Sequence, residues 1–335
     1  MKPAPNVGVR TYMTINEIDD VHQKFTLDFE LYFQWEDPEH PNLSIDDSNE
    51  EYEDISPPAW VPSFFICDTA QNEVLSDFKY KKRGGWYFGE VNWLVTINVT
   101  FDVHYFPFDR QILEVGLVCD NGELIPFDIT KGIPVSYKKS CTNSTVHYKL
   151  KTFKIENFEV MIEIKRGLSR SLHSIYITRS ADFYLANIVF VMFLIVLVSA
   201  SVYIIDVNDF GGRIGVLLTS ILTAVAFKFV TITFVPQVPY LTTLDIYNLI
   251  SFAALAVLIL QSVILHYTDE EYKETFNENF IFGFLILWVG LHLFIFIGSK
   301  LDIFSESWER VLKSIDEPPV ILPAKISLGT KTEEH

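Results

Sequence analysis

The sequence has few cysteines and a deficit of positive charge. Only Cys67, Cys119 and Cys141 occur among 335 residues, so at most one disulfide can form within the chain, and a disulfide-rich scaffold is excluded. The 26 lysines and arginines stand against 43 aspartates and glutamates, which gives a net charge of −17. This balance argues against a nucleic-acid-binding protein and against a polybasic protein of the membrane surface.

The sequence also lacks the short motifs of common enzyme active sites. It contains no G-x-S-x-G nucleophile elbow, no H-E-x-x-H zinc motif, no C-x-x-C pair and no glycine-rich phosphate loop. We therefore expect that the protein is not an enzyme and needs no cofactor. Whether it binds a metal stays open.

The first 179 residues consist of short β-type segments separated by turn signals. The segments are rich in Val, Ile, Phe and Tyr, and several alternate apolar with polar residues, which predicts half-buried strands. They are 7–15, 25–35, 60–67, 93–101, 111–118, 148–155 and 158–164. Pro, Gly, Asn and Asp fill the breaks. Residues 1–179 are therefore predicted to form a β-sandwich.

Four long apolar segments follow, at 183–205, 214–235, 246–265 and 280–297. A helix of about 20 residues rises ~30 Å, which is the thickness of a bilayer core. Residues 180–298 thus predict a four-helix transmembrane bundle with a short linker at 266–279.

The chain continues beyond this bundle as a C-terminal extension, 299–335. Apolar residues recur at helical spacing in 301–315, which predicts an amphipathic helix on the membrane surface or against a neighbouring subunit. They are Leu301, Phe304, Trp308, Val311, Leu312 and Ile315.

The second apolar segment carries hydroxyl groups and a lysine, Lys228, at membrane depth. On a helix, one continuous stripe combines small, hydroxylated and bulky apolar side chains. The stripe consists of Gly215, Thr219, Leu222, Ala226, Phe229 and Thr233. Periodicity alone leaves two interpretations open: close packing between helices, or the wall of a water-filled pore. Lys228 lies off the stripe, where its stem can reach toward the far interface or its charge can pair with Asp245.

Several motifs occur in the order in which pentameric ligand-gated ion channels carry them. The segment 101–111 (FDVHYFPFDRQ) resembles the loop between the sixth and seventh strands of that family, and 60–62 (WVP) resembles its third-strand motif. The segment 177–188 (ITRSADFYLANI) is similar to the junction of the last strand with the first span. The segment 235–247 (VPQVPYLTTLDIY) resembles the loop between spans two and three of prokaryotic members.

Within this Cys-loop receptor superfamily the chain is most similar to the prokaryotic type. Val99 and Leu113 stand where animal members have the cysteines that flank the FPFD loop, so that disulfide cannot form. The linker between spans three and four is also too short for a large cytoplasmic domain. Sequons at Asn42, Asn98 and Asn143 would matter only in a eukaryotic secretory pathway, so the source and any glycan stay open.

The resemblance implies a homopentamer in the plasma membrane, or in the inner membrane of a Gram-negative bacterium. The sandwich would be extracellular or periplasmic, and the linker 266–279 cytoplasmic. The second span of each chain would surround a central pore lined by the stripe. Leu222 would form a central apolar ring, and Leu222 and Phe229 would act as the gate.

Ion selectivity departs from the family's usual patterns. Cation-selective members usually carry Glu before the basic residue at the cytoplasmic mouth, and anion-selective relatives usually carry Pro-Ala. Here Gly212 precedes Arg213, and the nearest acids are Asp206 and Asp209. The acidic charge of five chains favours monovalent cations, but five Arg213 side chains facing the mouth would reverse this preference.

The resemblance also places coupling residues between the sandwich and the pore. Asp20, Asp109 and Arg179 fall where relatives bring acids and an arginine together, and buried charges need partners. The alternative is that Asp109 only caps a turn. The apolar tips of the FPFD turn would press on the 236–240 loop. The predicted coupling residues are Asp20, Phe106, Pro107, Phe108, Asp109, Arg179 and Pro239.

The ligand site is the least typical part. Relatives bind amines between subunits in a box of aromatic rings, but the matching positions here hold Glu30, Cys67, Cys119 and Asp120. The hairpin expected at 165–174 has no aromatic residue, although it contains His173, a candidate pH-sensitive group. The two carboxylates are candidates to receive a cation, a metal or a proton. The two cysteines would form a bridge or remain buried thiols.

Two functions remain. The first is a ligand-gated or pH-gated channel with passive, cation-selective conduction. The second is a membrane-anchored small-molecule receptor whose pore is non-conducting or anion-selective, since five Phe229 rings are bulky enough to close it.

Overall fold

The computed structural model describes residues 5–37, 52–126, 144–148, 152–165, 168–301, 303–304 and 311. The chain divides into two compact units. Among the described residues, the first unit holds 5–101 and 112–177, and the second holds 102–111 and 178–311. The FPFD loop, predicted as part of the sandwich domain, therefore groups with the helices.

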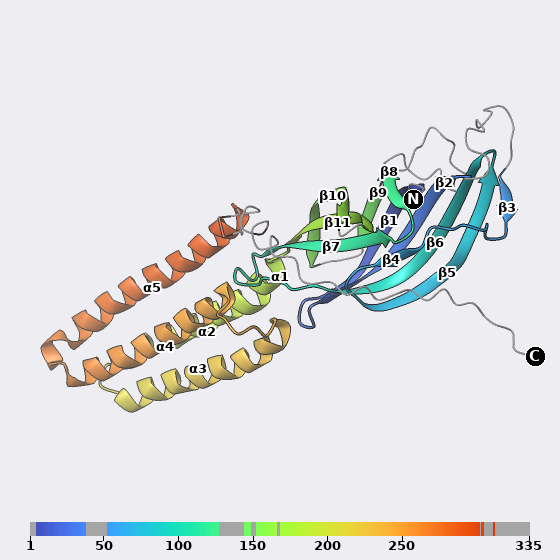
Figure 1. Cartoon of the computed structure of the whole chain (residues 1–335). Coiled ribbons are helices and arrows are strands. Elements are labelled where there is room, and N and C mark those ends of the chain that lie inside the picture. Colours follow the sequence, from blue (N-terminus) through green and yellow to red (C-terminus); the bar gives the residue numbers. More distant parts are fainter. Residues whose placement is uncertain are drawn as a thin grey trace, which may run out of the picture. The chain divides into compact units, whose positions relative to one another are not determined.

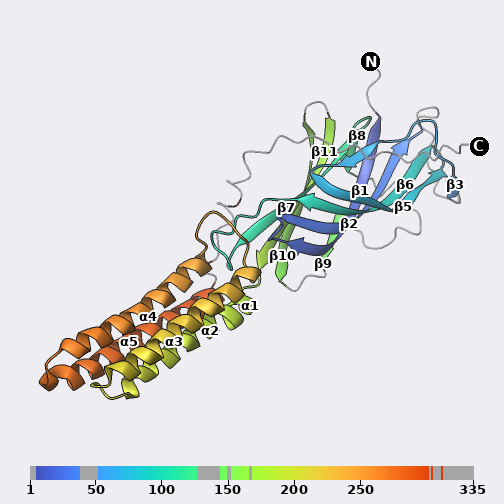
Figure 2. The same cartoon turned by 90° about the horizontal axis from the view of Figure 1, so that it is seen from below.

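The first unit consists of two β-sheets (Figures 1 and 2). In the described part of the chain, the larger sheet has the strand order β3-β5-β6-β2-β1-β8, with β9 also paired to β1, and the smaller has the order β10-β11-β7-β4. The larger sheet is formed by β1 (Asn6–Asp19), β2 (Lys24–Glu36), β3 (Glu53–Ile55), β5 (Thr69–Arg83), β6 (Trp86–Asn98), β8 (Glu123–Pro126) and β9 (Ser144–Tyr148). The smaller is formed by β4 (Phe64–Ile66), β7 (Arg110–Cys119), β10 (Phe153–Lys165) and β11 (Leu168–Arg179).

The core lies between these two sheets, and β2 shows why. Its alternate residues from Phe25 to Phe33 are almost fully buried, while those between them are half-exposed. Phe33 packs on Phe64 of the opposite sheet with 4.9 Å between ring centroids, and Phe29 lies 5.9 Å from the ring of His173. Each fully buried aromatic side chain contributes about 2–3 kcal/mol.

The structure corrects the strand predictions, and the two longest strands that the predicted segments miss are β5 and β11. The long strand β5 is absent from the predicted segments, because its residues are largely polar and exposed and three register irregularities against β6 break any alternation. The segment 165–174, predicted as a hairpin, already belongs to β11 from Leu168 onward. Its polar residues Ser169, Arg170, Ser171 and His173 are buried, which composition does not indicate.

The second unit holds four helices that are long and apolar enough to cross a membrane, as far as the chain is described. The first is continuous over Asp182–Ile204 and consists of α1 (Asp182–Tyr184), a π-helical segment η3 (Leu185–Val189), α2 (Phe190–Ser199) and η4 (Ala200–Ile204). The others are α3 (Phe210–Thr231, extended by η5, Ile232–Phe234), α4 (Thr243–Tyr267) and α5 (Glu270–Lys300). Figures 1 and 2 show them as roughly parallel rods.

Each of the four described helices begins before its predicted apolar segment, and α5 and α3 show the physical reason most clearly. Residues 270–279, predicted as linker, form the first turns of α5, so Thr268 and Asp269 alone separate it from α4. Acidic residues in the first turn complement the helix dipole, and Lys273 and Asn277 are buried against the rest of the unit. Likewise α3 begins at Phe210, because Asp209 caps it by accepting a hydrogen bond from the backbone N–H of Gly212.

Some predictions fall outside the described residues. Most of the amphipathic helix predicted at 301–315 lies there, as do Cys141, Asn42 and Asn143. The third sequon residue, Asn98, is exposed at the end of β6.

Candidate functional site

The centre of the site in the second unit is an ion pair between Asp109 and Arg179. The Arg179 Nε donates to Oδ1 of Asp109 at 2.7 Å, and Nη2 donates to Oδ2 at 3.1 Å. Both side chains are buried, with 1% exposure for Arg179 and 0% for Asp109. This two-point arrangement is the geometry that guanidinium and carboxylate groups prefer. Because a lone buried charge is costly, the pair holds the end of β11 to the FPFD loop.

The remaining groups around the pair come from the same loop and from the start of the first helix. Gln111 Nε2 donates to Asp109 Oδ2 at 2.8 Å and to the Asp102 carbonyl at 2.6 Å. The Arg179 guanidinium lies 4.7 Å from the centroid of the Phe106 ring, which packs edge-on against Tyr184. Cation–π attraction therefore adds to the ion pair.

The loop 102–111 also contacts the segment between α3 and α4. The ring of His104 stacks on Tyr240 with centroids 3.6 Å apart, and the Val103 N–H donates to the Tyr240 hydroxyl at 3.2 Å. The backbone N–H of Thr243 donates to the His104 carbonyl at 2.9 Å, and that of Leu244 donates to the Phe106 carbonyl at 3.1 Å. The loop thus supplies acceptors to the first turn of α4.

The other predicted coupling residues are distributed around this loop. Pro107 follows a cis peptide bond and is buried, and Phe108 packs on Phe304 with 5.5 Å between centroids. Pro239 is exposed, next to Tyr240. Asp20 lies in the other unit, in the turn after β1, so its place beside Arg179 stays a prediction.

Sequence reasoning does not identify His104, Tyr240, Gln111 or Tyr184 as members of this site. All four lie inside segments that carry the family resemblance, which is the available signal. The pairing of His104 with Tyr240, however, joins residues far apart in the chain, and no periodicity reports it.

The predicted stripe of α3 lies on the face that a single chain leaves unpacked. Its bulky members are largely exposed, with Leu222 at 69% and Phe229 at 71%. The opposite face, with Arg213, Leu217, Ala224 and Thr231, is buried. The Thr219 hydroxyl donates to the Gly215 carbonyl at 2.8 Å. Its hydrogen is therefore bound within the helix, and its oxygen lone pairs remain available outward.

Arg213 points away from this exposed face. Its side chain is buried, Nη2 donates to Asn277 Oδ1 of α5 at 2.7 Å, and Nη1 donates to the Ile205 carbonyl at 3.2 Å. By contrast, Asp209 is exposed just before α3, and Asp206 lies three residues earlier. Of these three charged side chains near the start of α3, the exposed ones are therefore the two carboxylates.

Lys228 lines a pocket of about 270 Å³ together with Asp245 and Asn248. The Asp245 carboxylate accepts hydrogen bonds from the N–H and hydroxyl of Thr242 and so caps α4. The structure puts Lys228 and Asp245 on one pocket but shows no ion pair between these two described residues.

The candidate ligand residues do not form one cluster by strand placement. Glu30 is on the outer face of β2 in the larger sheet, and Cys67, Cys119 and Asp120 follow or end strands of the smaller sheet. Glu30 accepts a hydrogen bond from the Tyr32 hydroxyl at 3.1 Å, and Tyr32 packs edge-on against Tyr12. Burial and the Glu30 charge raise the pKa of Tyr32. This aromatic pair beside a carboxylate depends on the β1–β2 register, which the sequence does not reveal.

Cys67 and Cys119 are both buried and no disulfide joins them, so the bridge considered between these two described residues is absent. Cys67 packs with Phe65 and Val118, while the Cys119 thiol donates to Asn121 Oδ1 at 3.6 Å. Burial raises the pKa of Cys119, which keeps it protonated. Asp120 is exposed in the turn after β7. Among the described residues no group of three or more His, Cys, Asp or Glu side chains is placed to hold a metal ion.

His173 is not a loop residue but a buried link between the sheets. Its Nδ1 lies 3.2 Å from the Val115 carbonyl, and its Nε2 lies 2.9 Å from the Thr11 hydroxyl. A carbonyl only accepts, so Nδ1 carries the hydrogen and Nε2 accepts from Thr11. Burial lowers the pKa of His173 to about 4, so the side chain is neutral at ordinary pH.

Residues 2–185 match the family model described as the neurotransmitter-gated ion-channel ligand binding domain. The match covers more than half of the 335 residues, and three of the four membrane-capable helices lie wholly beyond it.

Proposed function

Because the chain belongs to the neurotransmitter-gated ion-channel family, whose members are receptors rather than enzymes, we propose that it forms a homopentameric, cation-selective, ligand-gated channel. It is a multi-pass membrane protein, with four membrane-capable helices among the described residues that follow the sheets of the ligand-binding domain. The proposal adds that the N-terminal unit is extracellular or periplasmic, in a plasma or bacterial inner membrane, and that monovalent cations pass between the α3 helices.

The exposed stripe of α3 is the observation that carries the pore proposal. Its threonine oxygens are suited to water and cations, whereas rings of Leu222 and Phe229 are suited to closing a narrow passage by expelling water. Within the described part of the chain these side chains are exposed. In a ring of five chains, the stripe side chains of the five α3 helices would line one central pore.

The direction of Arg213 supports cation selectivity. An arginine at the mouth would repel cations, but this guanidinium is bound to Asn277 and Ile205 on the buried side of α3. The carboxylates of Asp206 and Asp209, together with the net charge of −17 per chain, favour cations near the entrance.

The contacts of the loop 102–111 support a route for gating. The loop is tied to the end of β11 by the Asp109–Arg179 pair and to the start of α4 by backbone hydrogen bonds. A ligand that shifts β11 or this loop would therefore shift the segment that connects α3 to α4. For the agonist we propose a cation held at Glu30 beside the rings of Tyr12 and Tyr32.

A second candidate function is a receptor without conduction. The observation that favours it is the size and exposure of Phe229, five copies of which would occlude the axis. Widening that ring by Phe229→Ala separates the candidates, because a pore shut only at this ring would then conduct.

The test is electrical recording from the full chain and from Phe229→Ala in planar bilayers with unequal KCl on the two sides, during application of amines, divalent cations and a pH series. We expect agonist-evoked currents that reverse near the potassium equilibrium potential. Reversal near the chloride potential would overturn cation selectivity, and silence of both proteins would leave the receptor function as the better account.

The pore wall has its own test that needs no agonist. Cysteines introduced at Thr219 and Ala226 should react with a water-soluble thiol reagent, while one at Leu217, on the buried face, should not. Labelling at Leu217 alone would show that the stripe is not wet. Cys67 and Cys119 are buried, so their background reaction is expected to be slow.

A further inference from the structure

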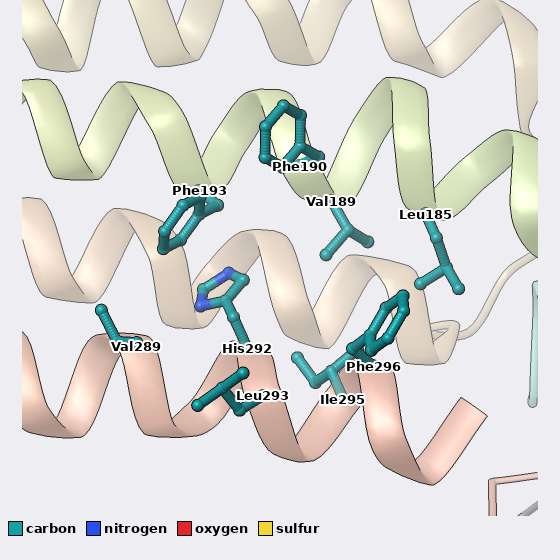
Figure 3. A pocket seen from close by; sticks show the side chains of 9 residues that line it. All are labelled: Leu185, Val189, Phe190, Phe193, Val289, His292, Leu293, Ile295 and Phe296. Atoms are coloured by element: carbon teal, nitrogen blue, oxygen red, sulfur yellow. The ribbon is translucent and has the colours of Figure 1, made fainter. Parts of the chain in front are cut away.

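Side chains of α2, α4 and α5 meet around the imidazole of His292 on α5. In Figure 3 it points from α5 toward the ring of Phe193 on α2, beside an apolar pocket of about 260 Å³. His292 Nδ1 lies 2.8 Å from the Trp288 carbonyl oxygen, and Nε2 lies 2.8 Å from the Tyr247 hydroxyl oxygen. The same hydroxyl lies 2.9 Å from the Val189 carbonyl oxygen, in the π-helical segment of the first helix.

These three contacts form a series that needs three hydrogens. The two carbonyl oxygens can only accept, and the Tyr247 hydroxyl supplies one hydrogen. A neutral imidazole supplies one more, which leaves one of the three short contacts between two lone pairs, whichever tautomer is chosen. An imidazolium supplies two. His292 then donates to the Trp288 carbonyl and to the Tyr247 hydroxyl, and that hydroxyl donates to the Val189 carbonyl.

Three aromatic rings lie within cation–π range of the His292 imidazole. The imidazole centroid lies 4.5 Å from that of Phe193, 4.6 Å from that of Trp288 and 5.6 Å from that of Tyr247. One ring comes from each of α2, α5 and α4. Aromatic faces at such distances attract a cation, and the attraction strengthens where water is excluded.

The other charged side chains of these helices make their contacts elsewhere. Of the three side chains that ring His292, the Tyr247 phenol is the titratable one, and Phe193 and Trp288 carry no charge. Asp245, two residues before Tyr247 on α4, is engaged by Thr242. Lys300, further along α5, pairs with Asp182 at 3.5 Å. Within the described residues no carboxylate contacts His292, so the proton is held by hydrogen bonds and rings.

We propose that His292 is a proton-binding site of the membrane domain, and that its imidazolium clamps α5 to α4 and to the π-helical segment of the first helix. Acid would therefore tighten the docking of α5. Of the four membrane-capable helices described, α5 has the smallest buried share of its apolar window, 6%. One added set of contacts therefore changes its docking appreciably. This inference goes beyond the proposed function. Only an effect of His292 protonation on gating depends on the proposed channel function.

The test reads the proton directly in the full chain, reconstituted in lipid nanodiscs with ¹⁵N-labelled histidine. The His292 signals are assigned by their loss in His292→Gln. On acidification we expect both ring nitrogens of His292 to become protonated. Tyr247→Phe removes the acceptor of Nε2–H and should lower the midpoint of this protonation by about one pH unit, a tenfold loss of proton affinity. A ring nitrogen that stays bare down to pH 4 would overturn the proposal.

Two further variants keep the test decisive. Tyr272→Phe removes an exposed hydroxyl from α5, the helix that carries His292, and should leave the midpoint of His292 protonation unchanged. Phe193→Leu removes one ring but no hydrogen bond and should also lower the midpoint, which serves if Tyr247→Phe does not fold. An unchanged midpoint in both Tyr247→Phe and Phe193→Leu refutes the site. None of these readouts needs ion conduction, so a silent channel would not be mistaken for failure of the proton site.

Discussion

At the scale of single residues, the fold buries charged side chains and supplies each with partners. Arg179 is held by Asp109 and the Phe106 ring, and Arg213 by Asn277 and the Ile205 carbonyl. The compensation differs: the first is a formal ion pair, and the second is a set of neutral acceptors. Loss of a partner should therefore matter most where the charge that remains is fully buried.

The ion pair leads to a prediction about stability. Asp109→Asn and Arg179→Gln should each lower the free energy of unfolding by about 3–5 kcal/mol, because each leaves a buried charge without its partner. The double variant should lose clearly less than the sum. Chemical unfolding of the detergent-solubilised protein measures this cycle, and additive losses would show that the two side chains do not interact.

His173 leads to a prediction about pH. Its ordinary pKa of 6.5 falls to about 4 in the folded chain. Above pH 6.5 neither state binds the proton, so stability is unaffected. As pH falls from 6.5 to 4, His173 binds a proton in the unfolded chain but not in the folded chain. The free energy of unfolding therefore declines by up to about 3 kcal/mol. Melting temperatures between pH 7.5 and 4.5 should fall less steeply in His173→Gln, and equal slopes would contradict the prediction.

At the scale of elements, α3 shows how one helix serves two environments. Its buried face packs within the chain, and its stripe is exposed among the described residues. The stripe's threonine hydroxyls donate back to carbonyls of their own helix, for example from Thr219 to Gly215 at 2.8 Å. They therefore add polarity to the stripe without leaving an unpaired hydrogen, which suits a wall that is wetted only when open.

The proposed gate leads to a prediction on this helix. Leu222→Thr should favour opening, with agonist responses at lower concentrations or current without agonist, because a polar ring holds water where leucine expels it. Val225→Thr is the matched control, since it adds a hydroxyl at nearly constant volume at an exposed position off the stripe. Concentration–response curves decide, and equal shifts in both variants would contradict a specific role of Leu222.

At the scale of the whole molecule, net charge leads to a prediction about salt. Each chain carries −17, and the field of such charges extends over about 10 Å at 0.1 M salt but about 3 Å at 1 M. Potassium-over-chloride permeability should therefore decline as salt rises from 0.1 to 1 M. Reversal potentials at a constant salt gradient measure it, and a ratio independent of salt would locate selectivity in direct contacts instead.

The order of elements along the chain can be predicted from the sequence, but their exact ends cannot. Four apolar segments and a strand-rich first half are properties of composition and period, so the residues alone indicate both. The strand β5 and the early turns of α5 escape such a prediction, because their residues are polar and are held by neighbours: β5 by β6, and α5 through Lys273 and Asn277.

The sequence by itself determined the family, the sandwich followed by four helices, and the stripe that shares one face of α3, since motif order and helical period are local properties. Tertiary structure alone decided that Arg213 turns away from that stripe, that His173 is buried, that Tyr12 stands beside Tyr32 and Glu30, and that His104 stacks on Tyr240. Each of these depends on a partner distant in the chain. Periodicity shows which residues share a face, whereas only packing shows what lies against it.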